Sequence, residues 1–147
     1  MSDDTFFGHG FKLVNGDLLV QDGRLAEISG QDNLLQALAL RILTPLAQDV
    51  FNTTYGLDVS AAFTEPNPLN VVKQIIKLNL VRTLATDRRV ADIRDIFFED
   101  EPEYRERHPE VGPEQVLEDR HRRTWKVDVI IQTANNQTQT LTAAVQA

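Results

Sequence analysis

The chain contains no cysteine, and this absence removes several kinds of chemistry at once. A disulfide framework, a thiolate metal site and a cysteine nucleophile all need thiols. It also has no run of about 18 apolar residues, the length that a membrane-spanning helix requires. The start, Met1-Ser2-Asp3-Asp4, lacks the basic and apolar regions of a secretory signal. We therefore expect a cytoplasmic protein that does not insert into membranes.

Basic residues are the second scarcity, with 15 Lys+Arg against 22 Asp+Glu and a net charge of −7. Nucleic-acid binding needs a clustered basic surface, so this charge balance argues against a nucleic-acid partner. A length of 147 residues is that of one domain, and we expect a single domain over 1–147.

Two turn dipeptides, Asn15-Gly16 and Asp22-Gly23, interrupt the apolar residues near the N-terminus. Both favour the positive φ of tight hairpins, and they predict a β-hairpin at about 17–28. The preceding segment, 1–12, is aromatic and punctuated by glycine. It reads as a flexible N-terminal arm that docks on some surface, and the residues leave open whether that surface belongs to its own domain.

Two helices follow from apolar residues at three- and four-residue spacing. Leu34, Leu38 and Ile42 predict a helix that Pro45 ends, with a short second piece over 46–51. Asn67-Pro68 marks the start of a second helix, which runs to about 85.

Strands are predicted over 90–98, over 125–131 and over 138–145. Trp125 begins a strict apolar alternation, and Asn135-Asn136 turns that strand into the last one. The chain is thus expected to be α+β, with two main helices packed on a small antiparallel sheet and with N-terminal and C-terminal β-hairpins. The last strand is a candidate for a sheet edge, and the alternative is an ordinary partnered strand that ends the fold.

Residues 99–123 form a charged insertion with nine acidic and five basic side chains. Val111, Val116 and Leu117 predict a short helix from Pro113 to about 122. The segment has little apolar surface, so we expect shallow packing and solvated side chains.

Candidate catalytic and metal-binding residues are sparse. A glycosidase needs two carboxylates at a suitable separation, and Glu27, Asp49, Asp58 and Glu65 are the candidates. With this many acids, some pair will meet that separation by chance, so caps and turns are the favoured roles.

The three histidines lack a metal-binding spacing, and neither the serines nor Gly8-His9-Gly10 lie in a nucleophile or phosphate motif. We expect no catalytic residue, no metal and no cofactor. The histidines and serines concerned are His9, His108, His121, Ser2, Ser29 and Ser60.

Asp87-Arg88-Arg89 lies between the second helix and the strand at 90–98. Two guanidinium groups at an element boundary can clamp carboxylates or carbonyls of a partner. They can equally serve as favourable cations at a helix C-terminus. The residues alone leave both interpretations open.

The order of these elements resembles the small baseplate protein of contractile tails. This family occurs in myophage baseplate wedges, type VI secretion systems and extracellular injection systems, and often carries the label "lysozyme-like". The resemblance covers about four-fifths of the chain. The segments that carry it are Gly16-Asp17-Leu18-Leu19-Val20, Gly30-Gln31-Asp32, Arg41-Ile42-Leu43-Thr44, Tyr55-Gly56-Leu57 and Asp87-Arg88-Arg89.

The chain departs from the family pattern in three places. Ala47-Gln48 stands where Gly-Glu is common, which removes a carboxylate that a hydrolase could use. The family's Glu-Pro-Arg motif appears as Asp87-Arg88-Arg89, so Arg89 carries over directly and Asp87 conservatively, while Arg88 replaces the proline. The charged insertion is also longer than the family leads us to expect.

The resemblance implies a structural role in a baseplate: joining the wedge to the tail and offering a strand edge that initiates the sheath. The implied partners are baseplate wedge proteins, sheath subunits and the tail tube. Asp87, Arg88 and Arg89 would bind the wedge. A monomer before assembly would become several copies in a symmetric particle.

Strand addition fits the last predicted strand, whose main-chain groups would pair with the sheath. Its partner-binding residues are Thr138, Thr140, Leu141, Thr142 and Val145. The alternatives are a peptidoglycan-cleaving glycosidase, as the label suggests, and a generic interaction module outside any tail.

Overall fold

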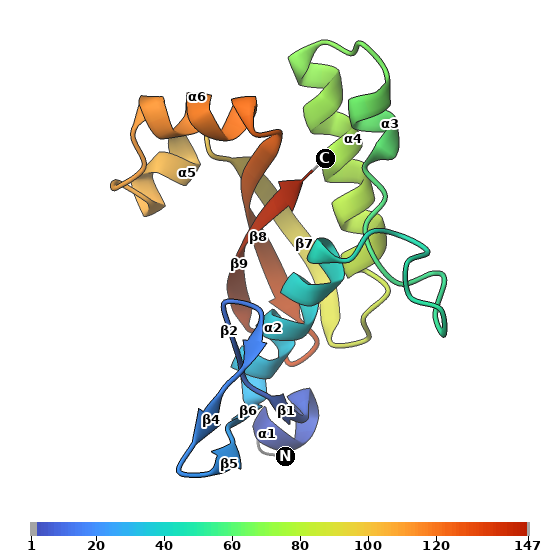
Figure 1. The fold of residues 1–147 in the computed structure, drawn as a ribbon, viewed down its shortest axis with the longest axis vertical. Coiled ribbons are helices and arrows are strands. Elements are labelled where there is room, and N and C mark those ends of the chain that lie inside the picture. Colours follow the sequence, from blue (N-terminus) through green and yellow to red (C-terminus); the bar gives the residue numbers. More distant parts are fainter. Residues whose placement is uncertain (1–2, 147) are drawn as a thin grey trace. The chain divides into compact units, whose positions relative to one another are not determined.

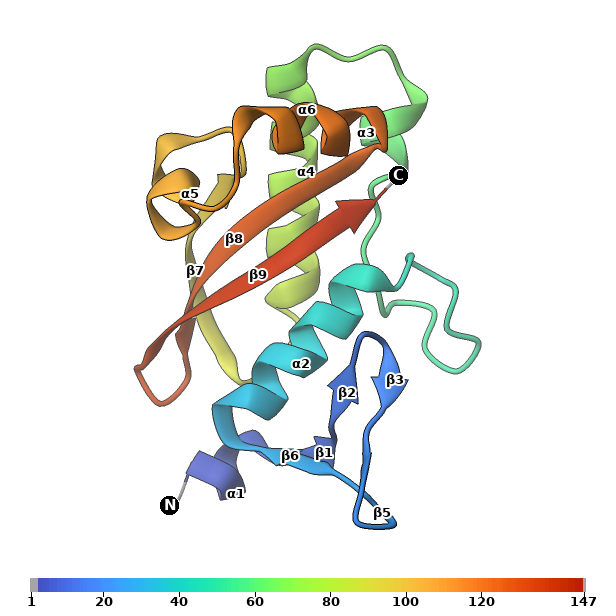
Figure 2. The same cartoon turned by 60° about the vertical axis from the view of Figure 1, so that its left-hand side comes forward.

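The computed structural model describes residues 3–146, with side chains from residue 5 onward. The chain divides into two compact units, residues 1–40 and 41–147. Within the described part the fold is mixed α+β, with six helices and several small antiparallel sheets, so the α+β part of the expectation is confirmed. Figures 1 and 2 show the elements of each unit from two directions.

The first unit consists of short paired segments that lead into a helix. Three two-stranded antiparallel ladders form, pairing β1 with β6, β2 with β3, and β4 with β5. Backbone hydrogen bonds among Lys12, Leu19 and Ala26 connect them. The elements are α1 (Asp3–Phe7), β1 (His9–Phe11), β2 (Leu13–Val14), β3 (Asp17–Leu18), β4 (Val20–Gln21), β5 (Arg24–Leu25), β6 (Glu27–Ser29) and α2 (Gly30–Leu43).

The predicted turns are present, but the single hairpin over 17–28 is wrong. Asn15-Gly16 and Asp22-Gly23 have positive φ and close two separate hairpins, at 13–18 and 20–25. Because each dipeptide closes its own tight turn, β3 pairs with the preceding strand β2, and β4 pairs with the following strand β5.

The segment predicted as an arm contains a helix and a paired strand. The Asn33 side chain donates to the Phe7 carbonyl (2.9 Å), and the Gln36 side chain donates to the Phe11 carbonyl (2.8 Å). Phe7 is fully buried. Residues 7–11 therefore dock on α2 of their own unit.

Helix α2 follows its predicted course and buries Leu34, Leu38 and Ile42. It ends at Leu43, two residues before Pro45, as predicted. The short helical piece expected over 46–51 is absent: the segment is irregular. There the Asp49 carboxylate accepts hydrogen bonds from the backbone N–H groups of Phe51 and Asn52, which favours a turn over a helix.

The second unit is built on a three-stranded antiparallel sheet in the order β7-β8-β9. The predicted helix at 113–122 is confirmed as α6, and the second main helix is confirmed as α4, which begins after Pro68. Two short helices, α3 and α5, were not predicted. The elements are α3 (Ser60–Thr64), α4 (Leu69–Leu84), β7 (Val90–Phe98), α5 (Pro102–Arg107), α6 (Pro113–His121), β8 (Thr124–Thr133) and β9 (Thr138–Gln146).

One face of this sheet is apolar and supports the core of the second unit. Trp125 packs edge-on against Phe98 of β7 and contacts Phe63 of α3. Helix α4 lies beside β7, and its Lys73 and Lys77 ammonium groups lie over the Phe98 ring. The buried residues of α4 are Val72, Ile76, Leu80, Thr83 and Leu84, and those of β8 on this face are Trp125, Val127, Val129 and Ile131.

Gly56 closes the loop between α2 and α3 against its own chain. The Leu57 amide donates to the Thr44 carbonyl (2.9 Å), and the Thr83 hydroxyl donates to the Gly56 carbonyl (2.6 Å). Gly56 has φ +116, and a Cβ here would lie 2.4 Å from the Thr44 carbonyl oxygen. Only glycine fits this close approach.

No helix among residues 3–146 combines the length and apolar character needed to cross a bilayer.

We predict that Gly56→Ala lowers the free energy of unfolding by about 2 kcal/mol or more, because the new methyl group both clashes and requires positive φ. Urea denaturation measures the effect. Gly16→Ala is the control, since Gly16 has φ +86 but open space around its Cβ position. It should lose only about 1 kcal/mol. Equal losses would show that the backbone contact at Gly56 contributes nothing.

Candidate functional site

Asp87 and Arg89 form a closed ion pair in the turn between α4 and β7. The Asp87 carboxylate accepts from the Arg89 backbone N–H (2.9 Å), Nε (2.9 Å) and Nη2 (2.7 Å). Burial pushes the pKa of Asp87 up, but these hydrogen bonds outweigh burial and hold it below its ordinary value. Hydrogen bonding to Asp87 likewise raises the pKa of Arg89. The pair therefore fixes the shape of the turn.

Arg88 lies between them and is exposed, so the three predicted residues have different environments. Nearby, the Arg41 guanidinium donates to the Thr86 hydroxyl (2.8 Å) and lies over the Tyr55 ring, 4.5 Å from its centroid. Burial raises the pKa of Tyr55 despite the positive charge of Arg41. We call Arg41, Tyr55, Asp87, Arg88 and Arg89 the arginine cluster. Three of the segments that carry the family resemblance thus meet at one place.

Strand β9 is an edge of the three-stranded sheet, as expected. The Thr133 amide donates to the Gln137 carbonyl (2.8 Å), so this pair is of the hydrogen-bonded kind. Antiparallel ladders alternate bonded and non-bonded pairs, and non-bonded pairs turn N–H and C=O outward. The register runs unbroken to Thr124↔Gln146. The outward-facing main-chain groups therefore belong to Thr138, Thr140, Thr142, Ala144 and Gln146.

The side chains of β9 alternate between solvent and core. Thr138 and Thr140 are exposed, whereas Leu141 and Val145 are buried under the sheet. The Thr142 hydroxyl donates to Asp128 (2.8 Å). Main-chain groups and the threonine face are thus what β9 presents outward, while Leu141 and Val145 hold the strand in place.

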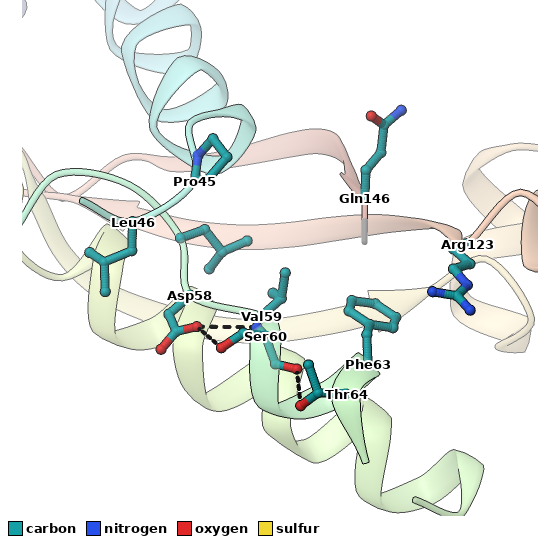
Figure 3. A pocket seen from close by; sticks show the side chains of 10 residues that line it. Pro45, Leu46, Asp58, Val59, Ser60, Phe63, Thr64, Arg123 and Gln146 are labelled. Atoms are coloured by element: carbon teal, nitrogen blue, oxygen red, sulfur yellow. Dashed lines mark hydrogen bonds between the residues drawn. The ribbon is translucent and has the colours of Figure 1, made fainter. Parts of the chain in front are cut away.

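An apolar hollow of about 540 Å³ lies beside the end of β9 (Figure 3). Pro45 and Leu46 line it beside Leu57, the bridge partner of Pro45, and the lining continues through the residues before α3 and through α3 itself. Arg123 and Gln146 complete the lining. The sequence gives no sign of this hollow, because its walls come from segments far apart along the chain.

The charged insertion packs more deeply than predicted. Asp128 of β8 is fully buried and accepts hydrogen bonds from Arg107 Nε (2.8 Å) and contacts His108 Nε2 (3.0 Å). His108 stacks on the buried Tyr104 ring, with centroids 4.3 Å apart. The expected solvated role of His108 is therefore wrong, because an interior carboxylate supplies its partner.

A second buried carboxyl group, Glu99, follows β7 directly and has no exposed surface. Its Oε1 lies 3.4 Å from Nη1 of Arg120, whose guanidinium covers the Trp125 ring at 3.3 Å. Burial raises the pKa of Glu99 to about 7, which the Asp119 charge supports and Arg120 opposes. Burial also pushes up the pKa of Asp119, but hydrogen bonds from Lys126 (2.8 Å) and Gln115 (3.0 Å) lower it below its ordinary value.

The candidate catalytic carboxylates have structural surroundings. Asp49 caps its turn, and Asp58 accepts from the Ser60 amide and hydroxyl. Glu27 lies on β6 and lines a separate shallow hollow, while Glu65 follows α3. Glu99 has the raised pKa that a general acid needs, but its complete burial keeps it from a polysaccharide.

No group of three or more metal-ligating side chains occurs within the described residues. Comparison of the chain with family models, curated proteins and solved structures finds no match in any of the three.

We predict that stability falls as pH rises from about 4.5 to about 7, because the folded state favours protonated Glu99. This contribution is complete below the ordinary pKa of 4.5 and lost above the folded value of about 7. Its full size is roughly 3 kcal/mol. Glu99→Gln, which mimics the protonated acid, should flatten this slope in urea titrations at several pH values.

Glu103→Gln, at an exposed position of α5, is the matched control and should keep the wild-type slope. An unchanged slope in Glu99→Gln would mean that Glu99 is ionised in the folded protein throughout this range.

Proposed function

We propose that the protein is a non-enzymatic baseplate component of a contractile tail or injection system. In this role it links the baseplate wedge to the tail and initiates sheath assembly by edge-strand pairing. The observation that carries the proposal is β9: an exposed edge strand of regular register whose alternate main-chain groups face outward. Such an edge is a template for an added strand.

The opposite edge of the sheet supports the choice of β9. Strand β7 shifts register twice, between Val90 and Asp92 and between Ile93 and Asp95. Its exposed residues include Asp92, Arg94 and Asp95. Bulges and charges are the devices by which proteins block strand addition. A partner strand is therefore expected at β9 alone.

The arginine cluster is the proposed surface for wedge proteins. Arg88 is the exposed cation that can reach a carboxylate or carbonyl of the partner. Asp87 and Arg89 hold the turn from which Arg88 projects, and the Arg41 and Tyr55 contact supports that turn from the neighbouring loop. The tail tube is the further proposed partner.

We also propose that α2 and α4 together pack on the sheet within one domain, with α4 as the support of β7. The protein would be a cytoplasmic monomer until several copies enter a symmetric baseplate. An edge of exposed threonines is consistent with a monomer, because it offers main-chain groups to a partner strand without a long apolar patch that would promote self-association.

Thr140→Pro should prevent sheath initiation while leaving the monomer folded, because proline removes one outward N–H and no bond to β8. The assay is co-purification with the candidate sheath subunit, together with sheath length in electron micrographs. Thr140→Val keeps the N–H and should behave as wild type. Normal sheath growth with a folded Thr140→Pro variant would exclude β9 as the template.

Arg89→Ala should leave the monomer folded, with a melting temperature within a few degrees of wild type, but prevent assembly of sheathed particles. The loss follows from release of Asp87, which no longer holds Arg88 in place. Arg24→Ala, an exposed arginine of β5, is the control for charge. Sheaths of normal length in Arg89→Ala particles would count against a role for the arginine cluster.

A further inference from the structure

The hollow beside β9 is lined mostly by apolar side chains and includes one arginine, although the protein is acidic. Its surface is mainly apolar, from Pro45, Leu46, Leu57, Val59 and Phe63. Figure 3 shows the Phe63 ring and the Arg123 side chain bordering the same space. A volume of about 540 Å³ lies within the usual range for ligand pockets, about 300–1,000 Å³.

The polar groups on one wall are already satisfied. Asp58 accepts from the Ser60 hydroxyl (2.7 Å), and the Thr64 hydroxyl donates to the Ser60 carbonyl (2.9 Å). Both contacts belong to the first turn of α3 and its approach. They leave the apolar side chains and Arg123 to recognise a ligand.

Arg123 differs from the arginines around it. Its side chain has no hydrogen bond or ion pair with the described residues, whereas Arg122 pairs with Glu118. Its backbone has φ +54, and its amide donates to the Arg120 carbonyl (3.0 Å). Arg123 follows Arg122, the C-cap of α6, and a left-handed residue commonly ends a helix at this position. In a chain of net charge −7 Arg123 is an unneutralised cation beside an apolar wall.

The hollow is continuous with the outward edge of β9. A second apolar hollow shares Pro45, Leu57, Val59 and Gln146 with it and extends to Ala144. Ala144 and Gln146 belong to the β9 residues whose main-chain groups face outward. A strand added to this edge would therefore reach the hollow with its side chains.

We propose that the hollow is the anchor pocket for an extended segment of the partner, which pairs with β9, places a large apolar side chain against Phe63, and sets the carboxylate of the residue two positions along on Arg123. This inference rests on the proposed strand addition. It adds the chemistry of the partner: an apolar residue and an acidic residue two positions apart, because only alternate side chains of an extended strand point to the same side. In strand addition, main-chain bonds supply affinity and such pockets supply specificity.

Two capped eight-residue peptides, Ac-Thr-Val-Thr-Phe-Val-Glu-Val-Thr-NH₂ and its counterpart with Lys in place of Glu, test the pocket in NMR titrations of the full chain. The Glu peptide should shift the resonances of Val59, Phe63 and Gln146. Arg123→Glu should weaken the binding of this peptide about tenfold or more and reverse the preference toward the Lys peptide. Arg24→Glu, with the same charge change outside the pocket, should alter neither affinity.

Ala144→Pro tests strand addition separately from the pocket, because proline removes one outward N–H of β9. Ala144→Ser keeps this N–H and is the matched control. If Ala144→Pro abolishes peptide binding and Arg123→Glu reverses the preference between the two peptides, strand addition and the anchor pocket are both supported. If Ala144→Pro abolishes peptide binding but the two peptides bind the wild-type protein equally well, the anchor pocket is excluded and strand addition remains supported. Binding that Ala144→Pro leaves unchanged, or no shift at millimolar peptide, overturns the anchor on β9.

Discussion

The close approach of Gly56 to the residues after α2 is the constraint on which the second unit depends. The Thr44 carbonyl accepts from Leu57, and the Thr83 hydroxyl fastens the same loop to α4. Because no side chain separates the two backbones, residues 44–46 lie against 56–59. This juxtaposition places Pro45 and Leu57 in the walls of the hollow and Tyr55 beneath Arg41. One glycine thereby positions parts of both proposed surfaces.

Charge plays an interior role that is unusual for so acidic a chain. Asp128 and Glu99 are fully buried. Arg107 of the insertion forms an ion pair with Asp128, and Arg120 lies beside Glu99, whose pKa burial raises to about 7. Buried ionic groups are costly unless paired. The segment 99–123 therefore docks through neutralisation and through Tyr104 and Val116, rather than through a broad apolar face.

The main elements were predictable because each is specified locally. Leu34, Leu38 and Ile42 define a helical stripe, and the alternation from Trp125 defines a strand. Asn15, Asp22 and Asn136 take the positive φ that their turns need. The short helices α3 and α5 have too few residues for a periodic pattern. The placement of Arg120 beside Glu99, like that of Pro45 and Arg123 around one hollow, depends on tertiary contacts that local sequence does not encode.

The two edges of the sheet are unlike, and this difference has a geometric consequence. A layer with one regular edge and one bulged, charged edge can be widened on one side only. Copies of the protein are not expected to pair edge to edge into closed or endless sheets, since the two edges do not match. A partner strand that pairs with β9 would therefore be added on one side of the sheet only. Its position along β9 would be set by the outward main-chain groups that β9 already presents.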